Sequence, residues 1–305
     1  MLHDLIIIGA GPAGLSAALY AARKKINALI LTDGASGQTV EAHLVENYLG
    51  IPSVPGNELL EKFKWHTKNT GIEIKDGVDI VKVESAGETF KILAHNDVFS
   101  AKTIIVAAGK KYRELEIPGA KEFAGKGITY CATCDAPLFK NKVVAVVGGG
   151  DAGQDAAWQL TQYASKIYLL NKYPELMGDD LRVQEKLNNH SRVEILNNCE
   201  PIEIKGDKFV KSLFIKQNGN VETRELAVDG IFVEIGSIPA SKFLADMVKL
   251  NDKNEVIVDS KTNMTSFPGI FAAGDITDIP YKQMIIAAGE GAKAALSVCE
   301  YLKNL

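Results

Sequence analysis

Residues 5–14 read Leu-Ile-Ile-Ile-Gly-Ala-Gly-Pro-Ala-Gly, an apolar run that passes directly into Gly9, Gly11 and Gly14. The short apolar run predicts a buried strand, and the apolar residues that recur every three or four positions after it predict a helix. Between a strand and a helix, the first glycine permits a tight turn and the second lets the backbone approach a pyrophosphate. The third allows the helix to pack closely on the strand. The stretch therefore predicts the first part of a nucleotide-binding βαβ unit.

The residues around these glycines extend that prediction. Pro12 and Ala13 lie at the start of the helix, where a helix N-terminus attracts an anion. A second apolar run, Ala28–Leu31, predicts the next strand, and Thr32 and Asp33 follow it. Either of these two residues fits the ribose-binding position of such a unit. The alternative is a glycine-rich turn without a ligand.

The same pattern returns later in the chain. An apolar run at 143–147 passes into a second glycine-rich turn, and 23 positions separate Gly148 from Asn171, as they separate Gly9 from Thr32. Equal spacing of matching elements predicts two copies of one nucleotide-binding unit. The candidate residues of a second dinucleotide site are Gly148, Gly150, Asp151, Gly153, Asn171 and Lys172.

The end of the second strand in the later copy should indicate which dinucleotide it binds. An acidic residue there would hydrogen-bond the ribose of NAD, and arginines would hold the extra phosphate of NADP. Residues 171–177 read Asn-Lys-Tyr-Pro-Glu-Leu-Met, without any of the five arginines of the chain. Lys172 alone offers a positive charge, so a retained fold with an unused nucleotide site competes with a working one.

Cys131-Ala132-Thr133-Cys134-Asp135 has the spacing of a redox disulfide or of half a zinc site. Zinc needs four ligands, and Cys199 and Cys299 are isolated, so we expect no metal. Two buried inert thiols are the other alternative. If burial raises its pKa, the acid Asp135 can supply the proton that thiol–disulfide exchange has to move. Its competing role is to cap a following helix.

Length and composition limit the classes of protein to which the chain can belong. The chain has 305 residues, enough for two domains at about 150 residues each. A net charge of −4 argues against a nucleic-acid partner. No apolar stretch reaches the roughly 18 residues of a membrane span. The first eight residues lack the basic region of a secretory signal, so we expect a cytoplasmic location.

Together the patterns predict an α/β protein with two Rossmann-like, three-layer nucleotide-binding domains. Apolar strands that run into glycine, at 103–109 and 230–236, end the two copies, and a helix at about 282–302 closes the chain.

From end to end the chain resembles the low-molecular-weight thioredoxin reductases, a branch (class II) of the flavin-dependent pyridine nucleotide-disulfide oxidoreductases. Beyond the first glycine turn, the resemblance rests on Gly37-Gln38, Val45-Glu46-Asn47-Tyr48, Ala107-Ala108-Gly109, Tyr-Cys-Ala-Thr-Cys-Asp at 130–135, Phe-Ala-Ala-Gly-Asp at 271–275, Tyr281-Lys282-Gln283 and Ala-Ala-Gly-Glu-Gly at 287–291. The segment at 131–135 is the most specific of these.

The resemblance implies that the second domain is inserted into the first: a discontinuous first domain covers 1–112 and 243–305, and the inserted domain, with the Cys-x-x-Cys motif, covers 113–242. It further implies FAD in the first domain, a homodimer, two alternating domain orientations and thioredoxin or a thioredoxin-like protein as substrate. It also implies that Cys134 faces the flavin, Cys131 attacks the protein substrate and Asp135 is the acid–base group. The residues that it places at FAD are Gly9, Gly11, Pro12, Ala13, Gly14, Thr32, Asp33, Gly37, Gln38, Asn47, Ala108, Gly109, Gly274, Asp275, Lys282, Gln283 and Met284.

One departure from this family bears on the electron donor. NADPH-using members carry His-Arg-Arg and a further Arg after the second strand of the inserted domain, where this chain has Asn171, Lys172, Tyr173 and Met177. Reduced ferredoxin is therefore favoured over NADPH, and NADH stays open. The alternatives are a conventional NADPH-dependent thioredoxin reductase, a flavin dithiol oxidase and a flavin-binding protein without turnover.

Overall fold

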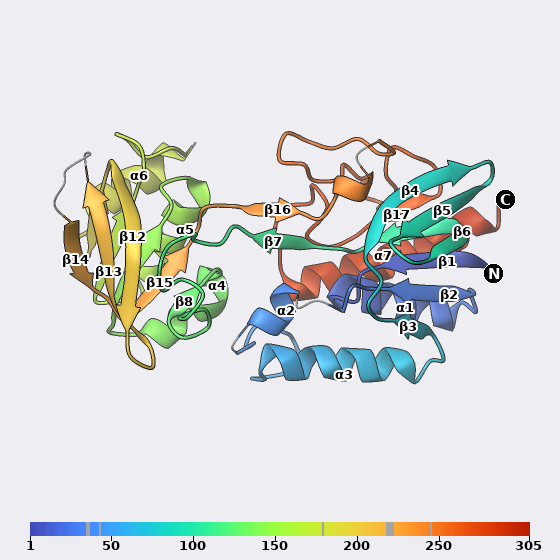
Figure 1. Cartoon of the computed structure of the whole chain (residues 1–305), viewed down its shortest axis with the longest axis horizontal. Coiled ribbons are helices and arrows are strands. Elements are labelled where there is room, and N and C mark those ends of the chain that lie inside the picture. Colours follow the sequence, from blue (N-terminus) through green and yellow to red (C-terminus); the bar gives the residue numbers. More distant parts are fainter. Residues whose placement is uncertain (35–36, 43, 179, 218–222, 245) are drawn as a thin grey trace. The chain divides into compact units, whose positions relative to one another are not determined.

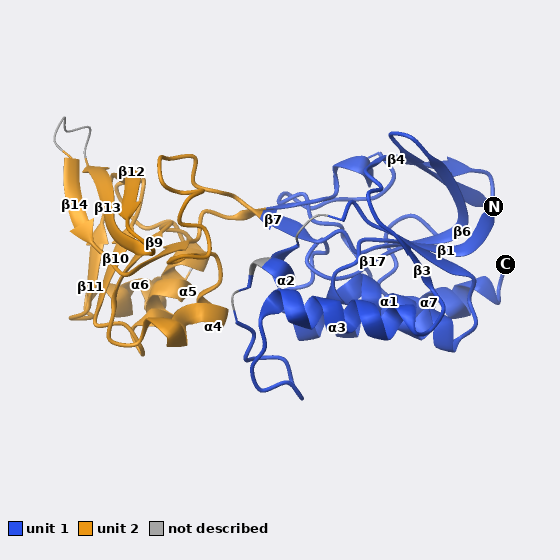
Figure 2. Cartoon of the chain, turned by 60° about the horizontal axis from the view of Figure 1, so that its bottom comes forward, with its two compact units in different colours: residues 1–111, 238–305 blue, residues 112–237 orange. Residues whose placement is uncertain are grey.

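The computed structural model describes residues 1–34, 37–42, 44–178, 180–217, 223–244 and 246–305. They form two compact units (Figure 2): unit 1 comprises residues 1–111 and 238–305, and unit 2 comprises residues 112–237. Unit 2 is therefore inserted into unit 1, and both are α/β. The two chain crossings, at β7 (Lys110–Tyr112) and β16 (Ser237–Pro239), pair with each other.

The second crossing comes earlier in the chain than the predicted boundary at 242/243. Residues 238–242 belong to unit 1 because its backbone and side chains hold them there. The Ala240 amide donates to the Gly109 carbonyl (3.0 Å), and the Ser241 hydroxyl donates to the Asn254 carbonyl (2.7 Å). Leu244, in the short helix η2 (Lys242–Leu244), is fully buried in the core of unit 1.

Unit 1 is built on a seven-stranded sheet with the order β3-β2-β1-β6-β5-β4, in which β17 also pairs with β6 (Figure 1). Its strands are β1 (Leu2–Ile8), β2 (Ala28–Leu31), β3 (Glu73–Lys75), β4 (Ile80–Ala86), β5 (Thr89–Ala94), β6 (Val98–Val106) and β17 (Ile270–Ala272). Strands β1, β2, β3, β6 and β17 pair in parallel with one another. Strands β4 and β5 form an antiparallel hairpin, and β5 also pairs antiparallel with β6.

Both faces of this sheet are buried. Along β1, Leu5 and Ile7 lie in one core cluster and Ile6 and Ile8 in another, because successive side chains of a strand point to opposite faces. Three helices pack on the first face: α1 (Pro12–Arg23), α3 (Gly56–Lys68) and α7 (Met284–Leu302). The second cluster includes buried side chains of the β4–β5 hairpin of the sheet itself, and Leu244 with its neighbours packs against them. The carboxyl ends of β1 and β17 lie beside the start of α1, since Gly274, which follows β17, is next to Ala13 of that helix.

Unit 2 repeats the plan with a five-stranded parallel sheet in the order β11-β10-β9-β15-β8. The strands are β8 (Ile128–Thr129), β9 (Val143–Val147), β10 (Lys166–Leu170), β11 (Val193–Leu196) and β15 (Gly230–Val233). Helices α5 (Asp151–Leu160) and α6 (Leu181–Asn188) cover one face. An antiparallel sheet of β12 (Cys199–Gly206), β13 (Val210–Gln217) and β14 (Thr223–Ala227) covers the other.

None of the helices within the described ranges has both the length and the apolar character needed to cross a bilayer.

Helices α1 and α7 lie in very close contact. A Cβ on the buried Gly291 would collide with the carbonyl of Ala13, whereas a Cβ on the exposed Gly289, in the same helix, would meet no described atom within 4 Å. The backbones of α7 and α1 can therefore approach each other only because residue 291 has no side chain.

This contact predicts opposite effects of two matched substitutions. Gly291→Ala should destabilise the protein by about 1–3 kcal/mol, since the helix has to move to admit the methyl group. Gly289→Ala should stabilise it by up to about 1 kcal/mol, because alanine favours a helix over glycine. Urea unfolding of both variants measures the difference, and equal stabilities would contradict the close approach.

Candidate redox site

The first glycine-rich turn in unit 1 leaves open space beside its second glycine. Gly9 has φ +108°, and a Cβ there would collide with the Ala107 carbonyl, while a Cβ on Gly14 would collide with the Gly9 carbonyl. A Cβ on Gly11 would meet no described atom within 4 Å. Two glycines are thus needed for packing, and the third faces free space at the N-terminus of α1. The turn fits a pyrophosphate, which the positive end of the helix would attract.

A second turn meets this one at the end of β17. Gly274 has φ +79°, and a Cβ there would lie 3.0 Å from the Ala13 Cβ. The buried Glu290 of α7 fixes the turn, because its Oε2 accepts a hydrogen bond from the Gly274 amide (2.7 Å). Gly274 and Asp275 are therefore held beside the first turn.

Two carboxyl groups in this region have raised pKa values. Burial raises the pKa of Asp275, and the positive charges of Lys110 and Lys282 oppose that rise. Burial also raises the pKa of Glu290, against the hydrogen bond from the Gly274 amide and the charge of Lys282. Lys282 itself forms an ion pair with Glu255 (Nζ to Oε1, 3.3 Å) and donates to the Thr277 carbonyl.

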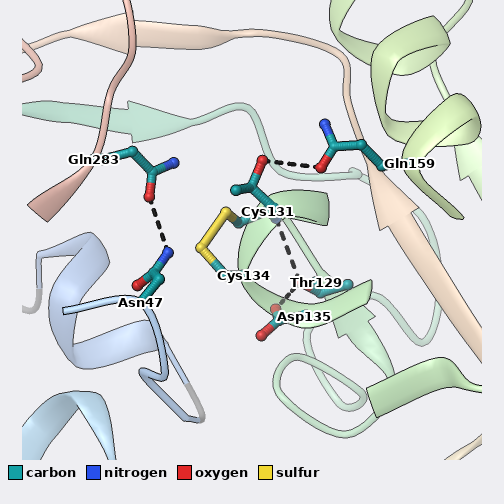
Figure 3. Close-up of a disulfide and its surroundings, with 8 residues drawn as sticks. Asn47, Thr129, Cys131, Cys134, Asp135, Gln159 and Gln283 are labelled. Carbon is teal, nitrogen blue, oxygen red and sulfur yellow. Dashed lines mark hydrogen bonds between the residues drawn. A yellow bond between two sulfur atoms is a disulfide. The ribbon is translucent and has the colours of Figure 1, made fainter. Parts of the chain in front are cut away.

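The other predicted side chains of unit 1 join distant segments of the chain. Gly37 precedes the short helix α2 (Gln38–Glu41), and Gln38 Nε2 donates to the Lys110 carbonyl (3.0 Å). Asn47 Nδ2 donates to Gln283 Oε1 (3.1 Å), as Figure 3 shows, and α7 begins at the next residue, Met284. Gln38, Asn47 and Gln283 are thus oriented by hydrogen bonds to other parts of unit 1.

The two ribose candidates differ in exposure. The Thr32 side chain is buried, and its hydroxyl accepts from the Gly34 amide (3.3 Å). Asp33 is exposed at the end of β2. The sequence could not separate them, and the structure turns Thr32 inward.

In unit 2 the two cysteines form a disulfide, with their Cα atoms 5.3 Å apart (Figure 3). Cys131 precedes the short helix α4 (Ala132–Asp135), and its carbonyl accepts from the amides of Cys134 (3.2 Å) and Asp135 (3.0 Å). Both cysteines are partly exposed. The zinc and inert-thiol alternatives therefore do not describe this pair.

Asp135 does not cap the helix that follows it. It precedes the 3-10 helix η1 (Ala136–Phe139) without a capping hydrogen bond from its side chain. Instead, Asp135 Oδ2 accepts a hydrogen bond from the hydroxyl of Thr129 in β8, as Figure 3 shows. Thr129 was missing from the sequence prediction, since a threonine two residues before a cysteine has no distinguishing pattern.

The glycine-rich turn in unit 2 is packed like the first but is closed by its own chain. A Cβ on Gly148 would collide with the Glu234 carbonyl, and one on Gly153 with the Gly148 carbonyl, so the packing glycines match. The Met177 amide, however, donates to the Gly149 carbonyl (3.0 Å), and Met177 forms a β-bridge with Gly150. A Cβ on Gly150 would lie 3.4 Å from the Met177 carbonyl oxygen, whereas the equivalent Gly11 faces open space.

Asn171 holds this closing segment in place. Its side chain is 1% exposed, and its Nδ2 donates to the carbonyls of Tyr173 (2.9 Å) and Glu175 (2.8 Å). A Cβ on Gly149 would collide with the Asn171 amide group. The residue at the strand end therefore orders the protein's own loop. Lys172, the other candidate, forms an exposed ion pair with Glu200 (2.8 Å).

Acidic side chains surround the start of α5. Asp151 lies in the first turn of the helix, and the first turn of α1 has Pro12 at the matching position. Burial and the charges of Asp151 and Asp180 raise the pKa of Asp155. Negative charge at a helix N-terminus opposes the binding of a pyrophosphate.

Comparisons with known proteins agree with this architecture. The model of the pyridine nucleotide-disulphide oxidoreductase family matches residues 3–294. The chain is 39% identical over 305 residues to the F subunit of alkyl hydroperoxide reductase from Escherichia coli K12, a match that covers 98% of this chain and 58% of that protein. The chain thus spans little more than half the length of this curated relative.

Solved structures give matches over almost the whole chain. Thioredoxin reductase from Streptococcus pyogenes MGAS5005 is 32% identical, with a TM-score of 0.93 over 100% of this chain and 99% of that one. A ferredoxin-flavin thioredoxin reductase from Clostridium acetobutylicum is 35% identical, with a TM-score of 0.54 and the same coverage.

The fold and the disulfide are those of a two-domain flavin disulfide oxidoreductase of the thioredoxin reductase type. The chain belongs to the pyridine nucleotide-disulphide oxidoreductase family. Membership implies a flavin, FAD, and the open turn of unit 1 fits its pyrophosphate.

The raised pKa of Glu290 predicts how stability depends on pH. The folded protein holds this proton more tightly than the unfolded chain, so the carboxyl group makes wild-type stability fall as pH rises from about 4.5 through the folded pKa. Glutamine does not titrate, so wild type should lose stability relative to Glu290→Gln over that rise.

Urea unfolding at several pH values measures this difference. Glu300→Gln, in the same helix, is the control with the opposite sign, because the hydrogen bond from Lys303 lowers the pKa of Glu300. A wild type that gains stability relative to Glu290→Gln as pH rises would contradict the raised pKa.

Proposed function

We propose that the chain is an FAD-dependent disulfide reductase that reduces thioredoxin or a thioredoxin-like protein through Cys131–Cys134, with an electron donor other than NADPH. Reduced ferredoxin is the favoured donor. The observation that carries the proposal is the contrast between the two glycine turns: Gly11 faces open space, while Met177 closes the space beside Gly150.

The residues of unit 1 have the shape and donors to hold FAD. The open turn at Gly11 and the N-terminus of α1 would take the pyrophosphate, and Gly274 offers the turn beside it. Gln38, Asn47 and Gln283 would lie against the ring system, as the resemblance implies, and Asp33 is the exposed candidate for the ribose. FAD, when bound, supplies a carrier that accepts electrons singly or in pairs.

The disulfide of unit 2 would pass electrons to the protein substrate by exchange. The thiolate of reduced Cys131 attacks the substrate disulfide, forms a mixed disulfide and releases one substrate thiolate, which takes up a proton. Cys134 then attacks Cys131, and the second substrate thiolate leaves. The substrate gains two electrons and two protons, and Cys131–Cys134 is again a disulfide. Asp135 would hold one of the protons that move.

Three features of unit 2 argue against NADPH as the donor. The space beside Gly150 is taken by Met177, and the buried Asn171 holds the closing loop. Asp151 places negative charge where a pyrophosphate would bind. The arginine fork that an NADP phosphate needs is missing from residues 171–177. The solved ferredoxin-flavin thioredoxin reductase of similar sequence supports ferredoxin as the favoured alternative. The homodimer and the cytoplasmic location stay predictions.

The donor assignment predicts selective reduction of the protein. Under anaerobic conditions reduced ferredoxin should bleach the flavin absorbance rapidly, while micromolar NADPH or NADH should act at least about 100-fold more slowly, because neither has an open site. Stopped-flow absorbance measures the rates. Fast bleaching by micromolar NADPH would overturn the assignment, and fast bleaching by NADH alone would replace ferredoxin with NADH.

If Cys131–Cys134 is the redox disulfide, a single substitution should abolish thioredoxin reduction without releasing the flavin. Cys134→Ser should retain flavin but lose thioredoxin reduction by at least about 1000-fold, because the exchange cannot be completed without the second thiol. Cys299→Ser, a substitution of a free and partly exposed cysteine, is the control and should keep wild-type activity. Flavin absorbance and insulin-coupled thioredoxin turnover give the two readouts. Activity that survives in Cys134→Ser would remove Cys131–Cys134 from the mechanism.

A further inference from the structure

A closed ring of hydrogen bonds joins Asp135 to the backbone of Cys131. The Cys131 amide donates to the hydroxyl oxygen of Thr129 (3.4 Å), and that hydroxyl donates to Asp135 Oδ2. The Asp135 amide in turn donates to the Cys131 carbonyl (3.0 Å). Figure 3 shows the two bonds of Thr129 beside the disulfide. A change in the position of the Cys131 backbone is therefore transmitted to the carboxyl group through one hydroxyl.

The rest of unit 2 holds Thr129 still. Thr129 is 8% exposed and lies in β8, where it pairs with Phe232 of β15. Phe232 is fully buried in the core beneath α5. A threonine in a strand has few rotamers because it is branched at Cβ. The hydroxyl is thus fixed by the sheet, and the acid, which lies on the short helix α4, takes its position from it.

One hydroxyl can serve both neighbours at once. A hydroxyl has one hydrogen and two acceptor lone pairs, so the Thr129 oxygen can accept from the Cys131 amide while the same group bonds Asp135 Oδ2. Removal of this one hydroxyl therefore breaks both links between the acid and the Cys131 backbone that run through Thr129.

We propose that Thr129 is a positioning residue for Asp135: its hydroxyl ties the acid to the Cys131 backbone and so fixes the carboxyl group beside the disulfide. The inference rests on the proposed function only in taking Asp135 as the acid of the exchange. Thr129 touches neither sulfur in this role and acts through Asp135.

Exchange with an external dithiol tests the proposal without an electron donor or a protein substrate. A dithiothreitol thiolate attacks one sulfur, the S–S bond breaks, and the cysteine thiolate that leaves takes a proton from Asp135. The second dithiothreitol thiol then resolves the mixed disulfide. Dithiothreitol ends as its cyclic disulfide and both cysteines end as thiols. The two protons that dithiothreitol loses equal the two that the cysteine thiolates take up, and one of these replaces the proton that Asp135 gave. Alkylation at timed intervals, followed by mass measurement, gives the rate.

Thr129→Val keeps the branched shape and loses the hydroxyl, and it should slow the exchange about tenfold, a part of what a general acid contributes. Thr129→Ser keeps the hydroxyl and should stay within about threefold of wild type. Thr161→Val is the matched control, since Thr161 is equally buried in unit 2 and its hydroxyl donates to the Trp158 carbonyl (2.6 Å). This control should lose stability but keep the wild-type exchange rate.

A double mutant separates positioning from a merely structural role. If Thr129 acts through Asp135, Thr129→Val should add less than about twofold to the slowing caused by Asp135→Asn. A further tenfold loss in the double mutant, or a wild-type rate in Thr129→Val, would overturn the proposal, as would an Asp135→Asn variant that exchanges normally. A protein that exchanges with dithiothreitol as described but never reduces thioredoxin would instead count against the proposed function alone.

Discussion

The structure depends on one contact that occurs twice: the first turn of a helix lies against the turn that ends the preceding strand, with no room for a side chain. Gly14 meets Gly9 in unit 1, and Gly153 meets Gly148 in unit 2. Each contact sets the direction of a helix, and each helix in turn buries one face of a parallel sheet. Gly291 adds a second close contact in unit 1, between two helices, because a Cβ there would collide with the Ala13 carbonyl in the first turn of α1. The substitution pair at 291 and 289 tests whether that closeness is required.

This contact does not constrain the second glycine of each turn, so the surroundings of that glycine can differ between the two units. Packing constrains the first and third glycines of each turn, but the second glycine faces whatever lies outside. In unit 1 that is open space, and in unit 2 it is the backbone of Met177. A fold can therefore keep its packing glycines and still lose its ligand, because the residues that hold the fold and the residues that admit the ligand are different ones.

Much of this was predictable from the sequence. The glycine spacing and the apolar runs determine the strand–turn–helix units, the repeat predicts two such units, and the family resemblance implies that one is inserted into the other. The absence of arginines at 171–177 indicated an altered nucleotide site. The closing of that site was not predictable, because it depends on Asn171 turning inward to three acceptors: the carbonyls of Tyr173 and Glu175 and the side chain of Asn197. Nor was the pairing of Thr129 with Asp135, which requires a helical turn at 132–135 to bring the acid back to the end of β8.

A unit that no longer binds a dinucleotide would still have a reason to keep its sheet. The disulfide lies between β8 and η1, and both are anchored to β15: Thr129 pairs with Phe232, and the Phe139 ring lies 5.0 Å from the Phe232 ring. A Cβ on Gly230 would collide with Phe139, so the strand and the short helix fit each other closely. Disulfide exchange needs the two sulfurs and the acid held in fixed positions relative to one another, and a buried parallel sheet provides a rigid support for them. The selective constraint on unit 2 would then come from Cys131, Cys134 and Asp135, and its glycine turn would be kept only as far as it supports β9 and α5.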